Sequence, residues 1–580
     1  MVSKVAASKC TSRSVSPISE RLTLLAAVSA VLAGACGGAE HGGGEMSGAD
    51  LVLTGGAVMT MDKAHPEATA IAIRGDRILA VGSDREVMSW VGRRTRVIQL
   101  EGRSVTPGLV DSHAHLYGLG SALESLSLKG AASEEEAAVK AKAAAATLPE
   151  GEWLVGRGWD QNLWPDKKFP SAATLDYALG GRPAALERID GHAVWVSSKA
   201  LELAGIDRST RDPKGGRIVR DGNGDATGVL IDAAMGLVDG KIPPPSDATR
   251  QRRVLAAAKL AIEAGITCVH EMGIDDATAD VYRNLEDERR LPLRIYAFLS
   301  GDPRTAGALP RRVPDIDRDG NARFIMRGVK FFADGALGSR GAVLLAPYSD
   351  DPKNSGLWVT PAGELERAIE AAVDGGWQPA VHAIGDAGVR AVLDAYQAVR
   401  LQQPKADLRL RVEHAQVVAP EDMTRFAKLG VIASMQPTHA TSDMPWAEAR
   451  LGPDRIRGSY AWRQMVDSGA QVAFGSDFPV EEVAPLYGIY AAVTRQDVKG
   501  QPPGGWRPEE KLTLEEAVRA FTSAGAYAGF AEKHRGQIKV GMVADITVYD
   551  RKLAADASLL QTKIDMTIVG GEPVYERATR

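Results

Sequence analysis

Two histidines, His113 and His115, stand two residues apart just after an apolar run at residues 105–110. Because side chains alternate between the two faces of a strand, both imidazoles are expected to point the same way. A pair of imidazoles at the end of a buried strand suits a divalent metal ion such as Zn²⁺. The same spacing also occurs in solvated turns, so the rest of the chain must decide between the two interpretations.

Four more polar residues stand at or near the ends of apolar runs, namely Lys330, His382, His414 and Asp477. Helical spacing between most of these runs predicts a (β/α)8 barrel of the TIM type, whose active sites form at the carboxyl ends of the strands. We therefore expect the four residues and the histidine pair to converge on one metal centre. The eight predicted strands are residues 105–110, 267–270, 293–299, 326–332, 379–382, 408–412, 431–435 and 472–475.

Each of the four residues also has a structural explanation. His382 or His414 alone is typical of a core histidine, and Asp477 after Gly-Ser resembles a helix N-cap. Lys330 has apolar neighbours, so burial would lower its pKa and leave a neutral amine that can react with CO₂ to form a metal-bridging carbamate. The alternative is a lysine that reaches solvent or pairs with Asp334. Together, however, the residues favour a metal centre.

The bulk composition is that of an ordinary soluble protein. Of 580 residues, 44% are hydrophobic and 25% are charged, and the net charge is -5. This mild charge argues against nucleic acid as a partner. The length predicts a large body with a smaller partner domain.

Both ends of the chain are rich in strand-like runs punctuated by Gly and Asp. We predict that residues 51–104 and 531–580 form one composite β-sandwich domain, and that residues 105–530 form the barrel. Between the first two barrel strands lies an excess of roughly 130 residues over a usual connection. This excess predicts an inserted subdomain at about residues 125–246, and the predicted fold class is α/β.

The first 36 residues have the features of a signal peptide, with a basic start and an apolar segment at 22–33 that is too short to span a membrane. The segment ends in small residues before Cys36, as in bacterial lipoproteins. We therefore predict an exported protein, periplasmic or at the cell surface, anchored to the membrane only by a lipid on Cys36, with a flexible tether at residues 37–50. A plain secretory peptide and a cytoplasmic form begun at Met46 are the alternatives.

Five segments of the chain resemble the amidohydrolase superfamily, and within it the amidohydrolase-3 family of YtcJ-like proteins and N-substituted formamide deformylase. The segments are VTPGLVDSHAHL, VKFFADGALGSRGA, HAIGD, RVEHAQ and FGSDFPV, and the resemblance covers about residues 50 to 576. It implies a metal-dependent barrel with a composite sandwich domain. It also implies a bridging, carboxylated role for Lys330 and one or two divalent ions, with zinc expected. The implied metal ligands are His113, His115, His382, His414 and Asp477.

The function implied by this resemblance is hydrolysis by a metal-activated water, with Asp477 accepting the water proton and passing it to the leaving nitrogen. We expect an amidohydrolase acting on a non-peptide carbon–nitrogen bond, of amide or N-formyl type, in a small molecule. Hydrolysis of an ester or lactone and a non-hydrolytic reaction on the same scaffold are the alternatives among enzymes. A surface-tethered binding lipoprotein without turnover is the alternative from another class, and a homodimer is one assembly that the chain could form.

The insertion carries residues that resemble family segments near the pocket, and we predict Trp159, Asp160 and His192 to bind substrate. Aromatic residues there are also typical of a subdomain core. Three further residues fall near the ends of the second and seventh strands and are candidates for supporting or lining the site: His270, Glu271 and His439.

Overall fold

The computed structural model describes residues 48–188, 193–213, 216–232, 234–301, 312–338 and 340–578, and residues 48–580 form one compact unit. The predicted signal peptide, Cys36, residues 37–47 of the predicted tether and His192 lie outside the described residues, so export, lipidation and the role of His192 stay predictions. The predicted end of the tether is wrong, because Ala49 is buried and its backbone N–H donates to the carbonyl oxygen of Trp90 over 2.8 Å. Within the described ranges, no helix is both long and apolar enough to cross a membrane.

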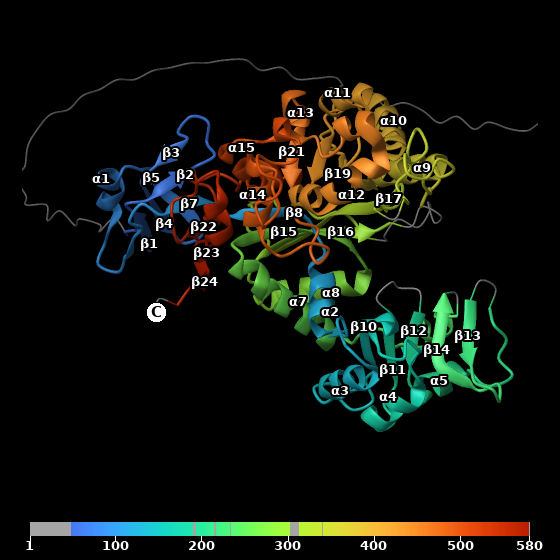
Figure 1. Cartoon of the computed structure of the whole chain (residues 1–580). Coiled ribbons are helices and arrows are strands. Elements are labelled where there is room, and N and C mark those ends of the chain that lie inside the picture. Colours follow the sequence, from blue (N-terminus) through green and yellow to red (C-terminus); the bar gives the residue numbers. More distant parts are fainter. Residues whose placement is uncertain are drawn as a thin grey trace, which may run out of the picture. The chain divides into compact units, whose positions relative to one another are not determined.

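Eight parallel strands form the central sheet, in the order β21-β20-β19-β18-β17-β16-β15-β8, and they nearly close into a barrel (Figure 1). Contacts between β21 and β8 bring the first and last strands together. Most residues on both faces of these strands are buried, because helices cover the outer face of the sheet. The barrel strands are β8 (Leu109–Ala114), β15 (Ile266–Ile274), β16 (Arg294–Ser300), β17 (Phe324–Phe332), β18 (Gln378–Ala383), β19 (Arg411–His414), β20 (Ile432–Met435) and β21 (Gln471–Phe474).

The predicted first barrel strand at residues 105–110 is wrong in its bounds. Its first part belongs to β7 (Ser104–Pro107), which pairs with β22 (Ile546–Tyr549) outside the barrel, and the barrel strand starts only at Leu109. The chain changes sheets at Gly108, where a Cβ atom would lie 2.2 Å from the Thr267 hydroxyl oxygen. Both halves are fully buried, so the sequence shows one apolar run where the structure has two strands.

The helices that follow the strands have the end signals expected for a barrel of this kind. In α7 (Asp247–Glu263), the side chain of Ser246 accepts a hydrogen bond from the backbone N–H of Thr249 and so caps the helix. One face of α7 buries Val254 and Ala258 against the barrel core. The other barrel helices include α2 (Leu116–Glu124), α8 (Asp276–Asp287), α9 (Ala362–Asp374), α10 (Asp386–Gln402), α11 (Pro420–Leu429), α12 (Pro437–Arg455), α13 (Trp462–Asp467), α14 (Pro485–Thr494), α15 (Leu514–Ala520) and α16 (Ser523–Ala528).

Two further sheets confirm the composite sandwich. One joins β22 and two other C-terminal strands to strands from the N-terminal part, in the order β24-β23-β22-β7-β2-β3, and the other has the order β5-β4-β1-β6. Apolar side chains of both sheets share one core, in which Leu53 and Ile73 meet Ile546 and Ile568. The strands are β1 (Leu51–Thr54), β2 (Ala57–Met59), β3 (Glu67–Ala68), β4 (Ala70–Arg74), β5 (Arg77–Gly82), β6 (Arg96–Gln99), β23 (Ile564–Val569) and β24 (Glu572–Glu576).

The predicted insertion is a separate six-stranded sheet between α2 and α7, in the order β13-β14-β12-β11-β10-β9. Helix α3 (Glu134–Ala145) and the strands share a core built around Trp159, Trp164 and Trp195. The strands are β9 (Leu126–Ser127), β10 (Leu154–Trp159), β11 (Ala184–Arg188), β12 (Ala193–Val196), β13 (Gly216–Arg220) and β14 (Ala226–Asp232).

Candidate metal centre

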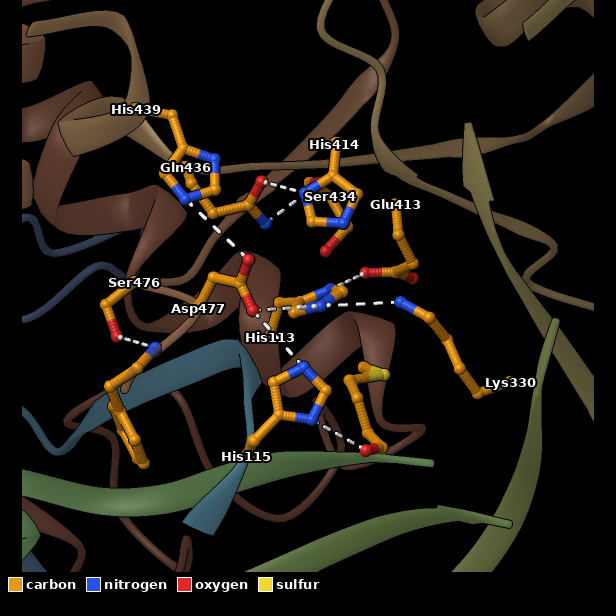
Figure 2. Close-up of polar contacts among 12 residues, drawn as sticks. His113, His115, Lys330, Glu413, His414, Ser434, Gln436, His439, Ser476 and Asp477 are labelled. Carbon is orange, nitrogen blue, oxygen red and sulfur yellow. Dashed lines mark hydrogen bonds and ion pairs between the residues drawn. The ribbon is translucent and has the colours of Figure 1, made fainter. Parts of the chain in front are cut away.

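The structure brings all six residues predicted from the strand ends to one cavity of about 390 Å³. They lie on or directly after β8, β17, β18, β19 and β21, far apart in the sequence but adjacent at the carboxyl end of the barrel, and Figure 2 shows all of them except His382. The residues are His113, His115, Lys330, His382, His414 and Asp477. Their convergence agrees with the sequence analysis, whereas their roles as metal ligands stay predictions.

Three of the histidines are anchored through their Nδ1 atoms (Figure 2). The Nδ1 atom of His113 lies 2.5 Å from Oε2 of Glu413, and that of His115 lies 2.9 Å from the backbone oxygen of Met272. The Nδ1 atom of His414 lies 2.8 Å from the side-chain oxygen of Gln436. When an acceptor holds Nδ1–H, the lone pair is on Nε2, which is the arrangement of a histidine that binds a metal.

Asp477 lies between the two histidines of β8 and is fixed by its own backbone. Its backbone N–H donates to the carbonyl oxygen of His113 over 2.7 Å. Its Oδ1 atom lies 3.5 Å from Nε2 of His113 and 3.3 Å from Nε2 of His115, and its Oδ2 atom lies 3.7 Å from Nε2 of His439. Burial alone would raise the pKa of Asp477, but the surrounding imidazoles outweigh it and hold this pKa below its usual value. Asp477 is therefore an ionised carboxylate at neutral pH.

The imidazoles of His113, His382 and His414 are neutral at neutral pH, whereas the neighbouring Asp477 raises the pKa of His115 against the effect of burial. Burial and the nearby Lys330 ammonium lower the pKa of His113 to about 4 and that of His382 to about 3. Burial and the neighbouring histidines lower the pKa of His414 well below its usual value. Neutral imidazole and ionised carboxylate are the forms that coordinate a metal ion.

Two groups of side chains have the composition of a metal site, and they share Asp477. One group is His113, His115 and Asp477, and the other is His414, His439 and Asp477, with the donor atoms of each group within 4.8 Å of one another. Among the described residues, Oδ1 of Asp477 and Nε2 of His439 are buried without a hydrogen-bond partner. Buried polar atoms without partners are rare and indicate a missing ligand. Imidazole nitrogen and carboxylate oxygen suit zinc-like ions, so the residues present fit a divalent metal.

A comparison with protein-family models matches residues 96–575 to the amidohydrolase family. The chain belongs to this family. It is 34% identical over 532 residues to the putative amidohydrolase YtcJ of Bacillus subtilis, covering 90% of this chain and 99% of that protein. It is 28% identical over 543 residues to N-substituted formamide deformylase of Arthrobacter pascens, covering 91% of this chain and 98% of the relative.

A solved structure extends this similarity to the fold. An uncharacterized metal-dependent hydrolase from Pyrococcus furiosus superposes with a TM-score of 0.73 at 28% identity, and the match covers 86% of this chain and 99% of the other. Together with the two His/Asp groups, these relationships make the chain a metal-dependent hydrolase of the amidohydrolase family.

Within this amidohydrolase site, His439 lies beside His414, as does the predicted metal ligand His382. His439 comes from the first turn of α12, and its ring stacks on that of His414 with 5.9 Å between centroids. His382 lines the same cavity, but its Nε2 atom lies 3.4 Å from the carbonyl oxygen of Gly335, and neither His/Asp group includes it. The sequence marked His439 only as a possible pocket residue, because it follows the seventh strand.

Lys330 is buried among the ligand candidates rather than exposed or paired with Asp334. Its Nζ atom lies 3.4 Å from Nε2 of His113, and burial lowers its pKa to about 8. Asp334 instead accepts backbone hydrogen bonds, among them those from Ile384 and Gly385. A buried amine with a pKa near neutrality has the neutral form that carbamate formation requires.

The residue that sequence reasoning missed is Glu413, together with the arginine that holds it. Arg411 is fully buried; its Nε donates to Oε1 of Glu413 over 2.7 Å, and its Nη1 lies 2.8 Å from Nδ1 of His270. The alternation of β19 was the available signal, since it places Arg411 and Glu413 on the same face. Their contact with His113 depends on how β19 and β8 meet across the barrel, which one sequence does not show.

The other supporting candidates lie in different places. His270 is buried in the barrel interior and contacts Arg411 rather than the cavity. Glu271 accepts hydrogen bonds from the backbone N–H groups of Leu116 and Tyr117, and so holds the start of α2 directly after His115.

Trp159 is fully buried in the core of the insertion, where its indole N–H donates to the carbonyl oxygen of Leu186 over 2.6 Å. Asp160 forms an ion pair with Arg188 at 3.3 Å. Among the described residues, neither Trp159 nor Asp160 lines the cavity of the metal centre. The packing of Trp159 agrees with the subdomain-core interpretation, and a part of either residue in substrate binding stays a prediction.

Proposed function

We propose that this metal-dependent hydrolase cleaves a non-peptide carbon–nitrogen bond of amide or N-formyl type. The observation that carries the proposal is the composition of the cavity: five histidines and the ionised carboxylate of Asp477 line it, and Oδ1 of Asp477 and Nε2 of His439 have no hydrogen-bond partner among the described residues. The type of bond is supported by one relative, whose name is N-substituted formamide deformylase and whose sequence aligns over 98% of its length.

The ligand set would consist of His113, His115 and Asp477, with His414 and His439 completing a second position next to Asp477. When bound there, a divalent ion such as zinc lowers the pKa of a water molecule and polarises the substrate carbonyl.

The proton transfers fall to Asp477. Its carboxylate is ionised at neutral pH, faces the cavity, and is held in place by the hydrogen bond from its own backbone N–H to His113. It accepts a proton from the attacking water and then delivers that proton to the nitrogen of the leaving amine, acting first as base and then as acid. Glu413 and Gln436 keep the rings of His113 and His414 turned toward the cavity.

Lys330 is proposed to bridge two ions as a carbamate. Its Nζ atom is buried beside His113, and a carbamate there would add an anion with two oxygens next to the group of His113, His115 and Asp477. In this arrangement two ions are expected per chain. With an unmodified Lys330, one ion is expected in the group of His113 and His115.

The experiment that tests the proposal combines metal content with turnover. The chain is purified without added metal or chelator, its metal is measured by elemental mass spectrometry, and release of formate is followed with N-formylated alkylamines and matched formate esters. One or two zinc-like ions per chain and faster amide than ester cleavage would support the proposal. Preference for the ester would favour an ester or lactone hydrolase. Absence of metal after zinc is supplied, with no turnover, would favour a binding lipoprotein.

Export and lipid anchoring at Cys36 are proposed on the sequence features of residues 1–36 alone. Mass spectrometry of the mature N-terminus, with and without a Cys36→Ala substitution, tests them. A diacylated or triacylated Cys36 is expected, whereas an unprocessed Met1 or a free N-terminus elsewhere would contradict the proposal.

A further inference from the structure

The cavity of the metal centre has a second acidic region that the proposed reaction does not use. Asp443 of α12 and Glu481, a few residues after Asp477, both line it together with the metal-ligand candidates. From their surroundings we infer that this cavity selects substrates carrying a protonated amine or guanidinium away from the bond that is cleaved, and that Asp443 binds this cation. The inference rests on the proposed function, which it extends by naming a class of substrate.

Asp443 is held so that one of its oxygens is left for a ligand. Its Oδ2 atom accepts hydrogen bonds from the hydroxyl of Tyr460 over 2.8 Å and from the amide of Gln416 over 2.9 Å. The amide of Gln416 also donates to the hydroxyl of Tyr460 over 2.6 Å, which closes a three-membered network. Both hydrogen bonds to Asp443 end on Oδ2, and the described residues provide none to Oδ1. The carboxylate is thus oriented in advance, with Oδ1 available for binding.

Among the described residues, no lysine or arginine pairs with these two carboxylates, although His439 acts to lower the pKa of Asp443. The partners of Asp443 are a hydroxyl and an amide, and Glu481 accepts a hydrogen bond from the hydroxyl of Ser442 over 2.7 Å. Burial of Asp443 and the negative charge of Glu481 raise the pKa of Asp443. Two neighbouring carboxylates without a cation are unfavourable, and a positively charged ligand relieves this repulsion.

The cations nearest to the cavity already have partners. Lys330 is surrounded by Glu413 and Asp477, whose charges raise its pKa against the effect of burial. Arg450 is ion-paired with Asp350 outside the lining of the cavity. Among the described residues, no lysine or arginine near the cavity is thus left to pair with Asp443 and Glu481, so these carboxylates can bind a cationic group of the ligand.

The wall beside Asp443 is suited to the apolar part of an organic cation. Trp446 follows Asp443 by three residues on α12, so the two side chains are neighbours on the helix surface. Both line the cavity, together with Leu337 and Ile384. An indole face next to a carboxylate is a favourable environment for an ammonium group on a carbon chain. This wall would hold the chain of the substrate and Asp443 its charged end.

An independent observation shows that the cavity is built to receive a ligand. Asp477 is only 7% exposed, lines the same cavity, and leaves its buried Oδ1 without a hydrogen-bond partner among the described residues. Its distance to Nε2 of His115, 3.3 Å, places this atom within the metal-ligand set. One cavity therefore contains both the reacting end and the cation-binding end of the proposed site.

The test uses two N-formylated substrates of equal length, one made from a linear diamine with a free protonated amine and one from the corresponding alkylamine. The metal-loaded full chain is expected to prefer the cationic substrate by about 10- to 100-fold in kcat/KM, the range of one hydrogen bond between charged groups. Asp443→Asn should remove most of this preference through KM. Glu448→Gln is the matched control, because Glu448 is an exposed residue of the same helix, and it should leave the preference intact.

Failure of this inference and failure of the proposed function are distinguishable. If both substrates are cleaved equally well, or if Asp443→Asn keeps the preference, the inference is wrong while the proposed function stands. If neither substrate is cleaved, binding of the linear diamine itself is measured by calorimetry. Binding to the native chain that Asp443→Asn weakens and Glu448→Gln does not would support the inference. Absence of binding would overturn it. If Asp443→Asn does not fold, Glu481→Gln takes its place, with a smaller loss of preference expected.

Discussion

The two ends of the barrel differ in how their buried polar and charged groups are paired. At the amino end, Arg294 at the start of β16 donates to both oxygens of Asp545 over 2.7 and 3.1 Å, and its third nitrogen donates to the carbonyl oxygens of Asn321 and Ala322. Burial alone would raise the pKa of Asp545, but the charge and hydrogen bonds of Arg294 hold it below its usual value. At the carboxyl end, Oδ1 of Asp477 and Nε2 of His439 are buried without a hydrogen-bond partner among the described residues.

This difference separates a structural region of the barrel from a functional one. The pair of Arg294 and Asp545 joins β16 to the composite sandwich, and its hydrogen bonds are made within the protein. The group around Asp477 is open toward a cavity and completes its interactions only with a ligand. In parallel barrels the amino end contributes stability and the carboxyl end carries catalysis. Substitutions at the two ends should therefore affect different properties.

The largest expected effect is that of Asp477→Asn on turnover. The amide cannot accept the proton of the attacking water, so kcat should fall by about 10²- to 10⁴-fold, the range of general acid–base catalysis. The thermal midpoint should change little, because the hydrogen bond from the backbone of residue 477 to His113 remains. Steady-state amine release and calorimetry provide the two measurements. Asp454→Asn, at an exposed residue of α12, is the control, and a fall in kcat of less than tenfold would contradict the role given to Asp477.

The opposite result is expected for Asp545→Ala at the amino end. The substitution leaves the guanidinium of Arg294 buried without its carboxylate, and removing one partner of a buried pair costs about 3–5 kcal/mol of folding free energy. The metal content and kcat of the folded fraction should be unchanged. Urea unfolding with Glu572→Ala as the exposed control measures the loss. A specific loss of turnover without loss of stability would remove the distinction between the two ends.

Glu413→Gln tests the region between the two ends, since Glu413 is fully buried but contacts His113. Gln keeps an acceptor for Nδ1 of His113 but removes the charge, and loss of such a partner typically weakens metal binding by about 10- to 100-fold. Competition with a zinc chelator measures this affinity. Unchanged metal affinity together with a large loss of stability would make Glu413 only a partner of Arg411.

The fold could be predicted largely because the apolar runs of the barrel alternate with helical segments and end in polar residues. The bounds of the first strand were wrong, because Ser104–Pro107 and Leu109–Ala114 are both buried and therefore read as one strand. The change of sheet is visible only in the close contact between Gly108 and Thr267. These residues are far apart in the sequence, so the contact could not be predicted from it.

The sequence predicts which residues meet at the site, but not how their side chains are oriented. The sequence analysis named His382 as a metal ligand and His439 only as a candidate for supporting or lining the site. In the structure the rings of both lie beside that of His414. Nε2 of His439 lies 3.7 Å from Oδ2 of Asp477, whereas Nε2 of His382 lies 3.4 Å from the carbonyl oxygen of Gly335. These are contacts across the barrel mouth, set by packing rather than by spacing in the sequence.

The smallest expected effect concerns an ion pair at the surface. Its two charges are paired within the protein, like those at the amino end of the barrel, but solvent screens them. Glu516 of α15 accepts hydrogen bonds from Arg463 over 2.7 and 3.0 Å, and this contact is the main cause that lowers its pKa to about 2. Since the unfolded chain has the ordinary value near 4.5, the stabilisation by Glu516 is complete above pH 4.5 and is lost as the pH falls toward 2. Glu516→Gln should cost less than about 1 kcal/mol at pH 7, because the pair is partly exposed. The unfolding free energies of the native chain and the variant should be measured at pH 7, 5 and 3.5, and the difference between them should shrink as the pH falls. A difference that stays constant would show that Glu516 acts through its hydrogen bonds with Thr513 rather than through its charge.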